Sequence, residues 1–334
     1  MTPQEVDGVL VEWGDRLFYG RRKFTKSPKG ADPLKAAYAA SLAKRAADIR
    51  VRVARLATPK AIQVMVKISG GGRGMKAIRA HLTYIAKHGK LEMETERGEV
   101  VQGKEALRDV MNEWRIGGHS PVPETSTRRE AFHIIFSMPD GTSPVAIKEA
   151  AAAVAKSEFA GHVYAMVLHE HQANPHVHLA VRAQGFSGKR LNPRKADLAR
   201  WREVFAQELR DRGIEAVATR QPVHGASRNH PPRWRVAASQ EGRARTDRPG
   251  IRDSASAKRS RLEALAAWAH VHQALSGSEH REDKELAAQL GRWLGTDPRI
   301  QSTRDMLGTA EGGRQPQSEH RLAPRPGGDG ERGN

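Results

Sequence analysis

The chain has 334 residues and no cysteine, and its 56 lysines and arginines against 38 acidic residues give a formal net charge of +18. Disulfides and thiolate catalysis are therefore excluded, and the length allows one large domain with appendages or two small domains. Because the positive charge is spread along the chain, it indicates a protein that meets a polyanion such as nucleic acid.

The first 57 residues are basic, and residues 34–55 have the composition of a helix. This N-terminal extension either lies along DNA or is an ordinary solvated helix, and the sequence does not separate the two. The organised domain begins near Pro59, because apolar side chains alternate over residues 62–68 as they do in a β-strand.

A glycine-rich segment at residues 70–74 follows this strand and opens a predicted helix from 75 to about 88, with Gly89 as a natural stop. The segment lacks the Lys-Ser/Thr pair of a nucleotide-binding P-loop, so ATP is not expected there. Its glycines and Arg73, at the start of a helix, are suited to hold a phosphate of a nucleic-acid backbone.

Strands and helices alternate through residues 58–225, with at least one antiparallel pairing, which predicts a sheet domain of the α/β class. Ser143 and Pro144 form an N-cap and first-turn pair for the alanine-rich helix in this region. The other predicted elements are helices at 104–114 and 198–213 and strands at 132–138, 162–169 and from 176 onward.

The composition changes after Gly225. Residues 226–257 are predicted to be a basic linker, and residues 258–296 carry the apolar spacing of a helical hairpin. Residues 297–334 are rich in glycine, proline and charge, so this tail is predicted to be disordered.

Residues 168–179 bring together His169, His176 and His178. His176 and His178 alternate with apolar residues, so both point from one face of a strand, and antiparallel pairing with the preceding strand brings His169 towards them. Three neutral imidazoles suit a divalent transition metal and leave positions open for substrate oxygens, although a His-x-His pair alone is common on solvated strands. A zincin motif needs a histidine at Ala173, and the zinc deaminase signature needs cysteines, so both are excluded.

The predicted helix at 75–88 carries Tyr84 on the flank of its buried stripe, about 100° from the centre at 3.6 residues per turn. His81 and His88 are the neighbours of Tyr84 on that flank, three residues before it and four after it. A tyrosine in such a position is more often amphipathic cover than a nucleophile.

These segments, taken in order, resemble a known family. The chain carries the glycine loop, then HLTYIAKHGK at 81–90, HIIFSMP at 133–139, and the histidine run at 169–178. This order is similar to that of the relaxases, or mobilisation nucleases, of conjugative plasmids and integrative elements, within the HUH endonucleases. The tyrosine-type branch, with its Asn-Pro-His-x-His turn, is the nearest match, and the resemblance covers about residues 61–218.

The resemblance implies an α+β sandwich in which helices flank a central, mainly antiparallel sheet, with the histidines on one sheet face and the tyrosine helix beside them. It implies that Tyr84 attacks a phosphate of one DNA strand at an origin of transfer, leaving a 5′-phosphotyrosyl link and a free 3′-hydroxyl. His169, His176 and His178 would hold Mg²⁺ or Mn²⁺, which stabilises the charge that develops on the phosphoryl oxygens. Because the link keeps the energy of the diester, the strand can be rejoined without ATP.

Many relatives carry an acid two residues after the first histidine, where this chain has His171. Glu170, His171 or His81 is expected to replace it as a general base or orienting group, and the sequence leaves the choice open. The resemblance also indicates DNA contacts at Arg73, Ser137, Lys189 and Arg190.

The expected partners are single-stranded DNA at an origin of transfer, relaxosome accessory proteins and a type IV coupling protein. A separate helicase is also expected, because the chain has no room for a helicase domain of its own. No apolar run approaches the roughly 20 residues of a membrane helix and no secretory signal is visible. We therefore expect a bacterial, cytoplasmic protein without membrane insertion, which is exported to a recipient cell with the transferred strand.

Two alternatives stay open. A rolling-circle replication initiator or a single-tyrosine transposase has related metal chemistry, but such enzymes typically carry the tyrosine after the histidines, whereas Tyr84 precedes them. A non-catalytic DNA-binding accessory protein explains the charge but not the three histidines. Such a protein binds DNA equally well with or without metal and never becomes covalently attached to it.

Overall fold

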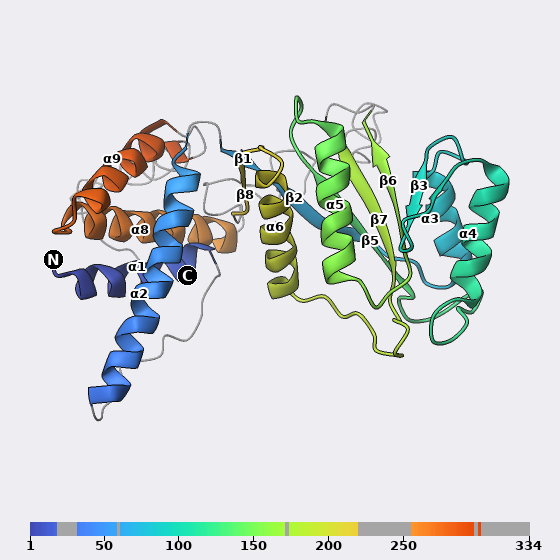
Figure 1. The fold of residues 1–334 in the computed structure, drawn as a ribbon, viewed down its shortest axis with the longest axis horizontal. Helices are drawn as coiled ribbons and strands as arrows, with labels where there is room; N and C mark the ends of the chain where they lie inside the picture. Colours follow the sequence, from blue (N-terminus) through green and yellow to red (C-terminus); the bar gives the residue numbers. More distant parts are fainter. Residues whose placement is uncertain (19–31, 59–60, 171–173, 220–254, 297–299, 302–334) are drawn as a thin grey trace, which may run out of the picture.

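The computed structural model describes residues 1–18, 32–58, 61–170, 174–219, 255–296 and 300–301. Figure 1 shows two units, a helical unit on the left that is built from both ends of the chain and a sheet domain on the right. Among the described helices, none combines the length and the hydropathy that a membrane span requires.

An antiparallel six-stranded sheet organises the middle of the chain, with the strand order β2-β5-β7-β6-β3-β4. The central strand β7 is buried along its whole length, including its two histidines and Arg182. The strands are β2 (Met65–Gly70), β3 (Met93–Thr95), β4 (Val100–Val101), β5 (Ala131–Ser137), β6 (Tyr164–His169) and β7 (His176–Arg182). The predicted central, antiparallel sheet flanked by helices is confirmed.

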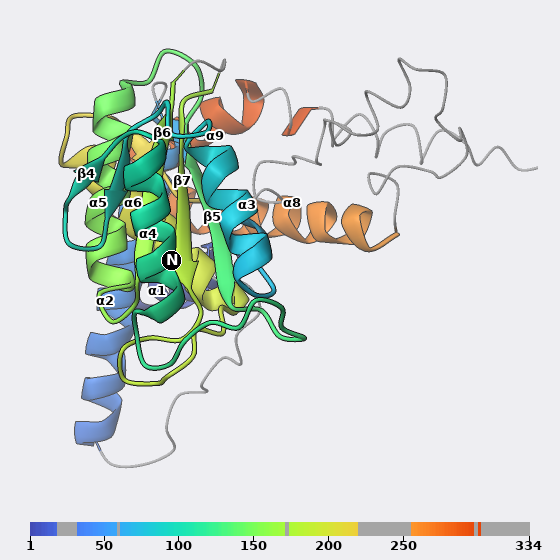
Figure 2. The same ribbon diagram turned by 90° about the vertical axis from the view of Figure 1, so that its right-hand side faces the viewer.

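Helices cover both faces of this sheet, and Figure 2 shows α3 and α5 on opposite sides of β5 and β7. The helices α3 (Met75–Ile85) and α4 (Lys104–Ile116) pack on the face that carries Val167 and Ala180. The helices α5 (Pro144–Glu158) and α6 (Lys195–Arg210) pack on the face of Phe136 and Val177. As predicted, Ser143 caps α5, because its Oγ accepts a hydrogen bond from the Ala146 N–H at 3.4 Å.

The strand predicted at residues 62–68 is divided in two. Its first part, β1 (Ile62–Gln63), pairs in parallel with β8 (Ala216–Val217), and only β2 joins the main sheet. The Val64 N–H still donates to the Val217 carbonyl at 3.0 Å, and from Met65 onward the chain pairs with β5 instead of β8. The alternation of apolar residues has the same period in both parts and therefore does not reveal the change.

The helix predicted at 75–88 ends earlier, at Ile85. Lys87, His88 and Gly89 have φ values of 48°, 60° and 85°, so the chain leaves the helix through three left-handed residues. The prediction that His88 lies beside Tyr84 on a common helix is therefore wrong.

The two ends of the chain form one helical unit with a common hydrophobic core. It contains α1 (Pro3–Phe18), α2 (Asp32–Leu56), α8 (Ala255–Ser276) and α9 (Arg281–Thr296). Trp268 lies in this core, edge-on to Phe18 and against Trp293. α2 therefore buries one face in this unit and exposes the other, and a contact of its exposed face with DNA stays a prediction.

Parts of the predicted organisation fall outside the described residues. They are the basic linker at 226–257, apart from its last three residues in α8, and the tail at 297–334, apart from residues 300–301. The predicted domain boundaries stay predictions.

Arg50 joins three helices of the helical unit. It donates to Asp7 on α1 at 2.7 Å and to both oxygens of Asp283 on α9 at 2.7 and 3.0 Å. Burial raises the pKa of Asp283, but hydrogen bonds from Arg50 and Ser278 outweigh burial and bring the pKa below its usual value. The stabilisation from this ionised carboxylate is therefore complete above about pH 4 and is lost as the pH falls through the lowered pKa.

We expect Arg50→Ala to lower the free energy of unfolding by about 3 kcal/mol, because the buried Asp283 carboxylate loses its charged partner. Urea unfolding at neutral pH, followed by circular dichroism, measures this change. The matched control is Arg281→Ala, which removes an exposed pair with Glu285 on α9 and should cost no more than about 0.5 kcal/mol. Equal losses in the two variants would contradict the central role of Arg50.

Candidate functional site

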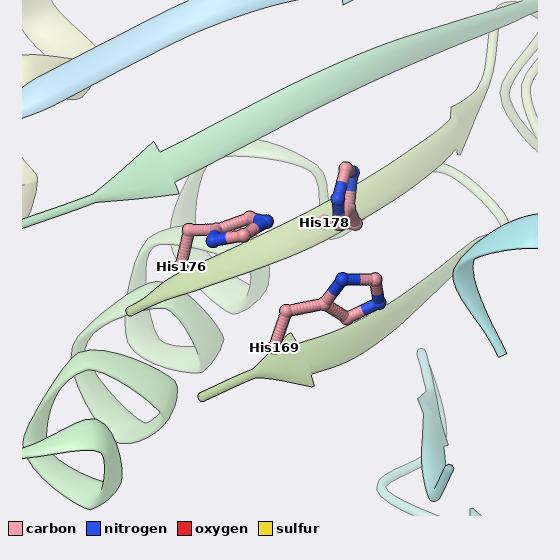
Figure 3. A group of neighbouring side chains, drawn as sticks. All are labelled: His169, His176 and His178. Atoms are coloured by element: carbon pink, nitrogen blue, oxygen red, sulfur yellow. The ribbon is translucent and has the colours of Figure 1, made fainter. Parts of the chain in front are cut away.

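Three histidines converge at the end of the β6–β7 pair. His169 lies directly opposite His176 across the two strands, and His178 follows on the same face of β7. Figure 3 shows the three rings gathered above these strands, and one ligand nitrogen from each lies within 4.8 Å of the other two. The ring centroids are 4.6 to 5.2 Å apart, and the residues are only 4% to 9% exposed.

Backbone carbonyl groups fix the orientation of two of these rings. The Nε2–H of His169 donates to the Ile85 carbonyl at 2.7 Å, and the Nδ1–H of His176 donates to the Asn174 carbonyl at 2.9 Å. In a neutral imidazole the other nitrogen then carries a lone pair. Nδ1 of His169 and Nε2 of His176 are therefore the atoms that can bind a metal ion.

His178 completes a donor set that fits a divalent transition metal. Burial, together with the neighbouring histidines His169 and His176, lowers the pKa of His178 to about 3, so this ring is neutral at pH 7. Its Nδ1 is buried and has no hydrogen-bond partner within the described ranges. Three imidazoles, two of them held by carbonyl groups, match the ligands that transition metals take from proteins.

Tyr84 lies at the C-terminal end of α3, beside these histidines. Its side chain is 64% exposed, and its ring stands edge-on to His178 with the centroids 6.5 Å apart. The carbonyl of Ile85, the next residue, is one of the last carbonyls of α3 and accepts the hydrogen bond from His169. This bond ties the end of the tyrosine helix to the metal-ligand candidates, so Tyr84 is presented to solvent at the edge of the three-histidine site.

Two further histidines extend the cluster. His81 on α3 stacks on His133 of β5 with the ring centroids 3.3 Å apart, and it also contacts His178 edge-on at 6.2 Å. Burial lowers the pKa of His81 to about 4, and burial with the charges of His81 and Arg129 lowers that of His133 to about 3. The sequence reasoning did not select His133. Its alternation with Ser137 on β5 was the available signal, since both side chains point to the face of the three histidines.

The three predicted candidates for the general base differ in their position relative to Tyr84 and in their exposure to solvent. His81 lies one turn before Tyr84 on the same helix, but a pKa near 4 makes it a weak base at neutral pH. Glu170 is exposed directly after β6, and His171 lies outside the described residues.

The predicted phosphate site at the start of α3 is only partly supported. The N–H groups of Met75 and Lys76 donate to the carbonyl oxygens of Pro123 and Glu124 at 2.9 and 3.1 Å. Those two N–H groups are already satisfied by carbonyl oxygens, so the phosphate site, which stays a prediction, would depend on Arg73 and on other N–H groups of the loop. The Arg73 side chain remains exposed beside it.

The other predicted DNA contacts are not equally accessible. Ser137 is opposite His176 in the β5–β7 pair, but it is only 3% exposed and its Oγ lies 3.4 Å from the Pro175 carbonyl oxygen. Lys189 is exposed. Arg190 is partly buried and pairs with the buried Glu130 at 3.1 Å. Neither residue is beside the three histidines, because both follow the far end of β7.

The comparison with protein families agrees with this geometry. Residues 84–214 match the family model described as relaxase, MobA/VirD2-like, nuclease domain. The matched segment contains Tyr84 and all three histidines, and it excludes the helical unit. No curated protein is similar enough to the chain to count as a match.

Proposed function

Since its residues 84–214 match the family model of a MobA/VirD2-like relaxase nuclease domain, we propose that the chain nicks and rejoins one DNA strand at an origin of transfer through a tyrosyl intermediate. The observation that carries the proposal is the position of Tyr84, exposed and edge-on to His178 at the rim of the three-histidine site. A nucleophile beside a metal-ligand cluster is the arrangement that phosphoryl transfer requires.

In the proposed reaction, the Tyr84 oxygen loses its proton to a base and bonds to the scissile phosphorus. The bond from phosphorus to the 3′ oxygen breaks, and that oxygen takes up a proton to become a free 3′-hydroxyl. The 5′ phosphate stays on Tyr84 as a phosphodiester, so attack by a 3′-hydroxyl reverses the step. Glu170, His171 and His81 remain the proposed candidates for the base.

His169, His176 and His178 are proposed to hold the divalent metal ion. When bound, this ion supplies positive charge to the phosphoryl oxygens in the transition state. The carbonyl groups of Ile85 and Asn174 keep His169 and His176 in the required tautomers. Because two of the three ligand rings are already oriented before the metal ion binds, less conformational entropy is lost when the site assembles.

We expect removal of the metal to stop cleavage. EDTA should abolish formation of the protein–DNA adduct, and Mn²⁺ should restore it at a lower concentration than Mg²⁺, because three neutral nitrogens favour a transition metal over a cation that prefers oxygen. Titration of each metal into the EDTA-treated chain, with the adduct measured on denaturing gels, tests both points. An undiminished adduct yield in EDTA contradicts the metal assignment.

The direct test of the function uses the full chain and single-stranded oligonucleotides tiled across the transfer origin of its native element. An adduct on the 5′ side of a break, mapped to Tyr84 by mass spectrometry, supports the proposal. Metal-independent binding without an adduct on any oligonucleotide supports an accessory DNA-binding protein instead.

The proposal includes the partners of a conjugative relaxase. Relaxosome accessory proteins would place the chain at the origin, a separate helicase would unwind the duplex, and a type IV coupling protein would export the chain with its strand. The net charge of +18 supports the DNA-binding part of this proposal, because lysine and arginine contacts provide salt-dependent affinity for any sequence.

A further inference from the structure

A basic pocket of about 460 Å³ lies at the opposite end of the sheet from the three histidines. It forms where the segments before β5 and before α6 meet the end of β2, and its size is within the range of about 300–1,000 Å³ found for ligand sites. Its lining joins apolar walls to arginines: Ile68, Phe132 and Leu191 with Arg128, Arg129 and Arg190.

The pocket carries more positive than negative charge. Glu130 is 4% exposed and is paired with both Arg128 and Arg190, at 2.8 and 3.1 Å. Arg129 is exposed and forms no ion pair with any residue that the structure describes. Its guanidinium lies 5.0 Å above the centre of the Phe132 ring. The pocket therefore offers a free positive charge and a flat surface next to each other.

A strand of DNA that passes over the edge strand β2 has a route between the two sites. Met65 and Lys67 on the edge strand β2 are exposed, and their cross-strand partners Ser137 and Ile135 are in turn paired with His176 and His178. Directly opposed residues share one face of a sheet, so Lys67 points to the face of the histidines. Ile68, the next residue on β2, and Phe132 point to the other face of the sheet, the face covered by α5 and α6, so a DNA strand reaches the pocket by passing over the edge strand β2. Phe132 is about 17 Å along β5 from Ser137 at 3.4 Å per residue.

Arg129 also influences the histidine cluster. Its charge contributes to the low pKa of His133, which stacks on His81 next to His178. His133 directly follows Phe132 on β5, but the two side chains point to opposite faces, so one strand contacts both sites by passing round the sheet edge at β2.

We propose that this pocket holds one unstacked nucleotide of the single-stranded DNA substrate, several positions away from the scissile phosphate. The base stacks on the guanidinium of Arg129, which itself lies over the buried Phe132 ring, and the charge of Arg129 neutralises the adjoining phosphate. Aromatic and guanidinium surfaces stack on any base, and a groove of positive charge follows the backbone. The inference rests on the proposed function for the identity of its ligand, but its test measures binding alone.

The test compares Arg129→Ala with Arg108→Ala, since Arg108 is an exposed arginine on α4, outside the pocket. Both variants carry Tyr84→Phe so that cleavage does not contribute. Binding of fluorescent oligothymidylates, shortened one nucleotide at a time, is measured by anisotropy at several salt concentrations. With Arg129 intact, we expect a step of about ten-fold in affinity at the length that just fills the pocket.

Arg129→Ala should lose this step, and its plot of log affinity against log salt should become less steep by about 0.7, the value for one phosphate contact on a single strand. Arg129→Lys should keep the salt dependence and lose the step, because lysine has charge but no planar surface. The inference is overturned if Arg129→Ala binds every length as tightly as Arg108→Ala with the same salt dependence. These results do not depend on whether Tyr84 is the nucleophile. A missing adduct would contradict the proposed function, whereas a missing affinity step would contradict the proposed nucleotide pocket.

Discussion

Tyr84→Phe should abolish the covalent protein–DNA adduct and lower the cleavage rate by roughly 10⁶-fold, a loss comparable to that of removing the nucleophile of another enzyme. Only the phenolic oxygen is lost, and the ring is 64% exposed, so neither the core nor the histidine site changes. Affinity for single-stranded DNA should therefore stay within about two-fold of the original. Such a change is smaller than the effect of losing one stacked base, which contributes roughly 1 kcal/mol. Denaturing gels of an origin oligonucleotide measure the adduct, and anisotropy measures binding.

Tyr38→Phe is the matched control, because it removes the same oxygen from α2 in the helical unit, far along the chain from the nuclease segment. This variant should form the adduct at the normal rate. If Tyr84→Phe still becomes attached to DNA through another residue, Tyr84 is not the nucleophile and the edge-on contact with His178 has a structural role only.

His176→Ala is expected to lower metal affinity and cleavage together, each by more than about 100-fold. Loss of a group that merely supports a ligand costs about 10- to 100-fold, and His176 is proposed as a ligand itself. Calorimetric titration with Mn²⁺ measures the affinity, and adduct formation at saturating DNA measures the cleavage. Binding of DNA in EDTA should change little, because the His176 side chain is only 9% exposed and its loss removes no lysine or arginine contact with the backbone.

His119→Ala provides the control for His176→Ala, since His119 is an exposed histidine outside the three-histidine cluster. It should leave Mn²⁺ affinity and cleavage unchanged. His169→Ala removes both a candidate metal ligand and the hydrogen bond to the Ile85 carbonyl, so it tests the ligand and the anchoring of α3 together. Cleavage by His176→Ala at the original rate would remove His176 from the reaction.

The three-histidine site was predictable because it depends on local rules. The alternation of His176 and His178 and the short turn before them determine one face and one pairing, and β6 and β7 have that pairing. The position of Tyr84 beside the cluster was expected from the family resemblance, whereas its helix spacing alone indicated only a flank. The hydrogen bond from His169 that holds the end of α3 depends on a backbone carbonyl, which no side-chain pattern reveals.

Features that depend on distant parts of the chain were not predictable in the same way. The stacking of His81 on His133 requires both the β5–β7 register and the position of α3 across the sheet. The pocket at Arg129 requires segments before β5 and α6 to meet. The common core of α1, α2, α8 and α9 requires contact between helices on either side of the sheet domain, and each helix alone has only an ordinary apolar stripe.

The common core of the helical unit affects the order in which the chain can fold during its synthesis on the ribosome. The sheet domain is complete in sequence before α8 is synthesised, whereas the apolar faces of α1 and α2 remain uncovered by α8 and α9 until those two helices have been synthesised. The parallel pairing of β1 with β8 holds the entry and exit of the sheet domain side by side, so the folded domain acts as a short link between the two halves of the core. Closing a short loop costs less entropy than closing a long one. Folding of the sheet domain therefore prepares the assembly of the helical unit, and a chain that stops before α8 keeps those apolar faces exposed to aggregation.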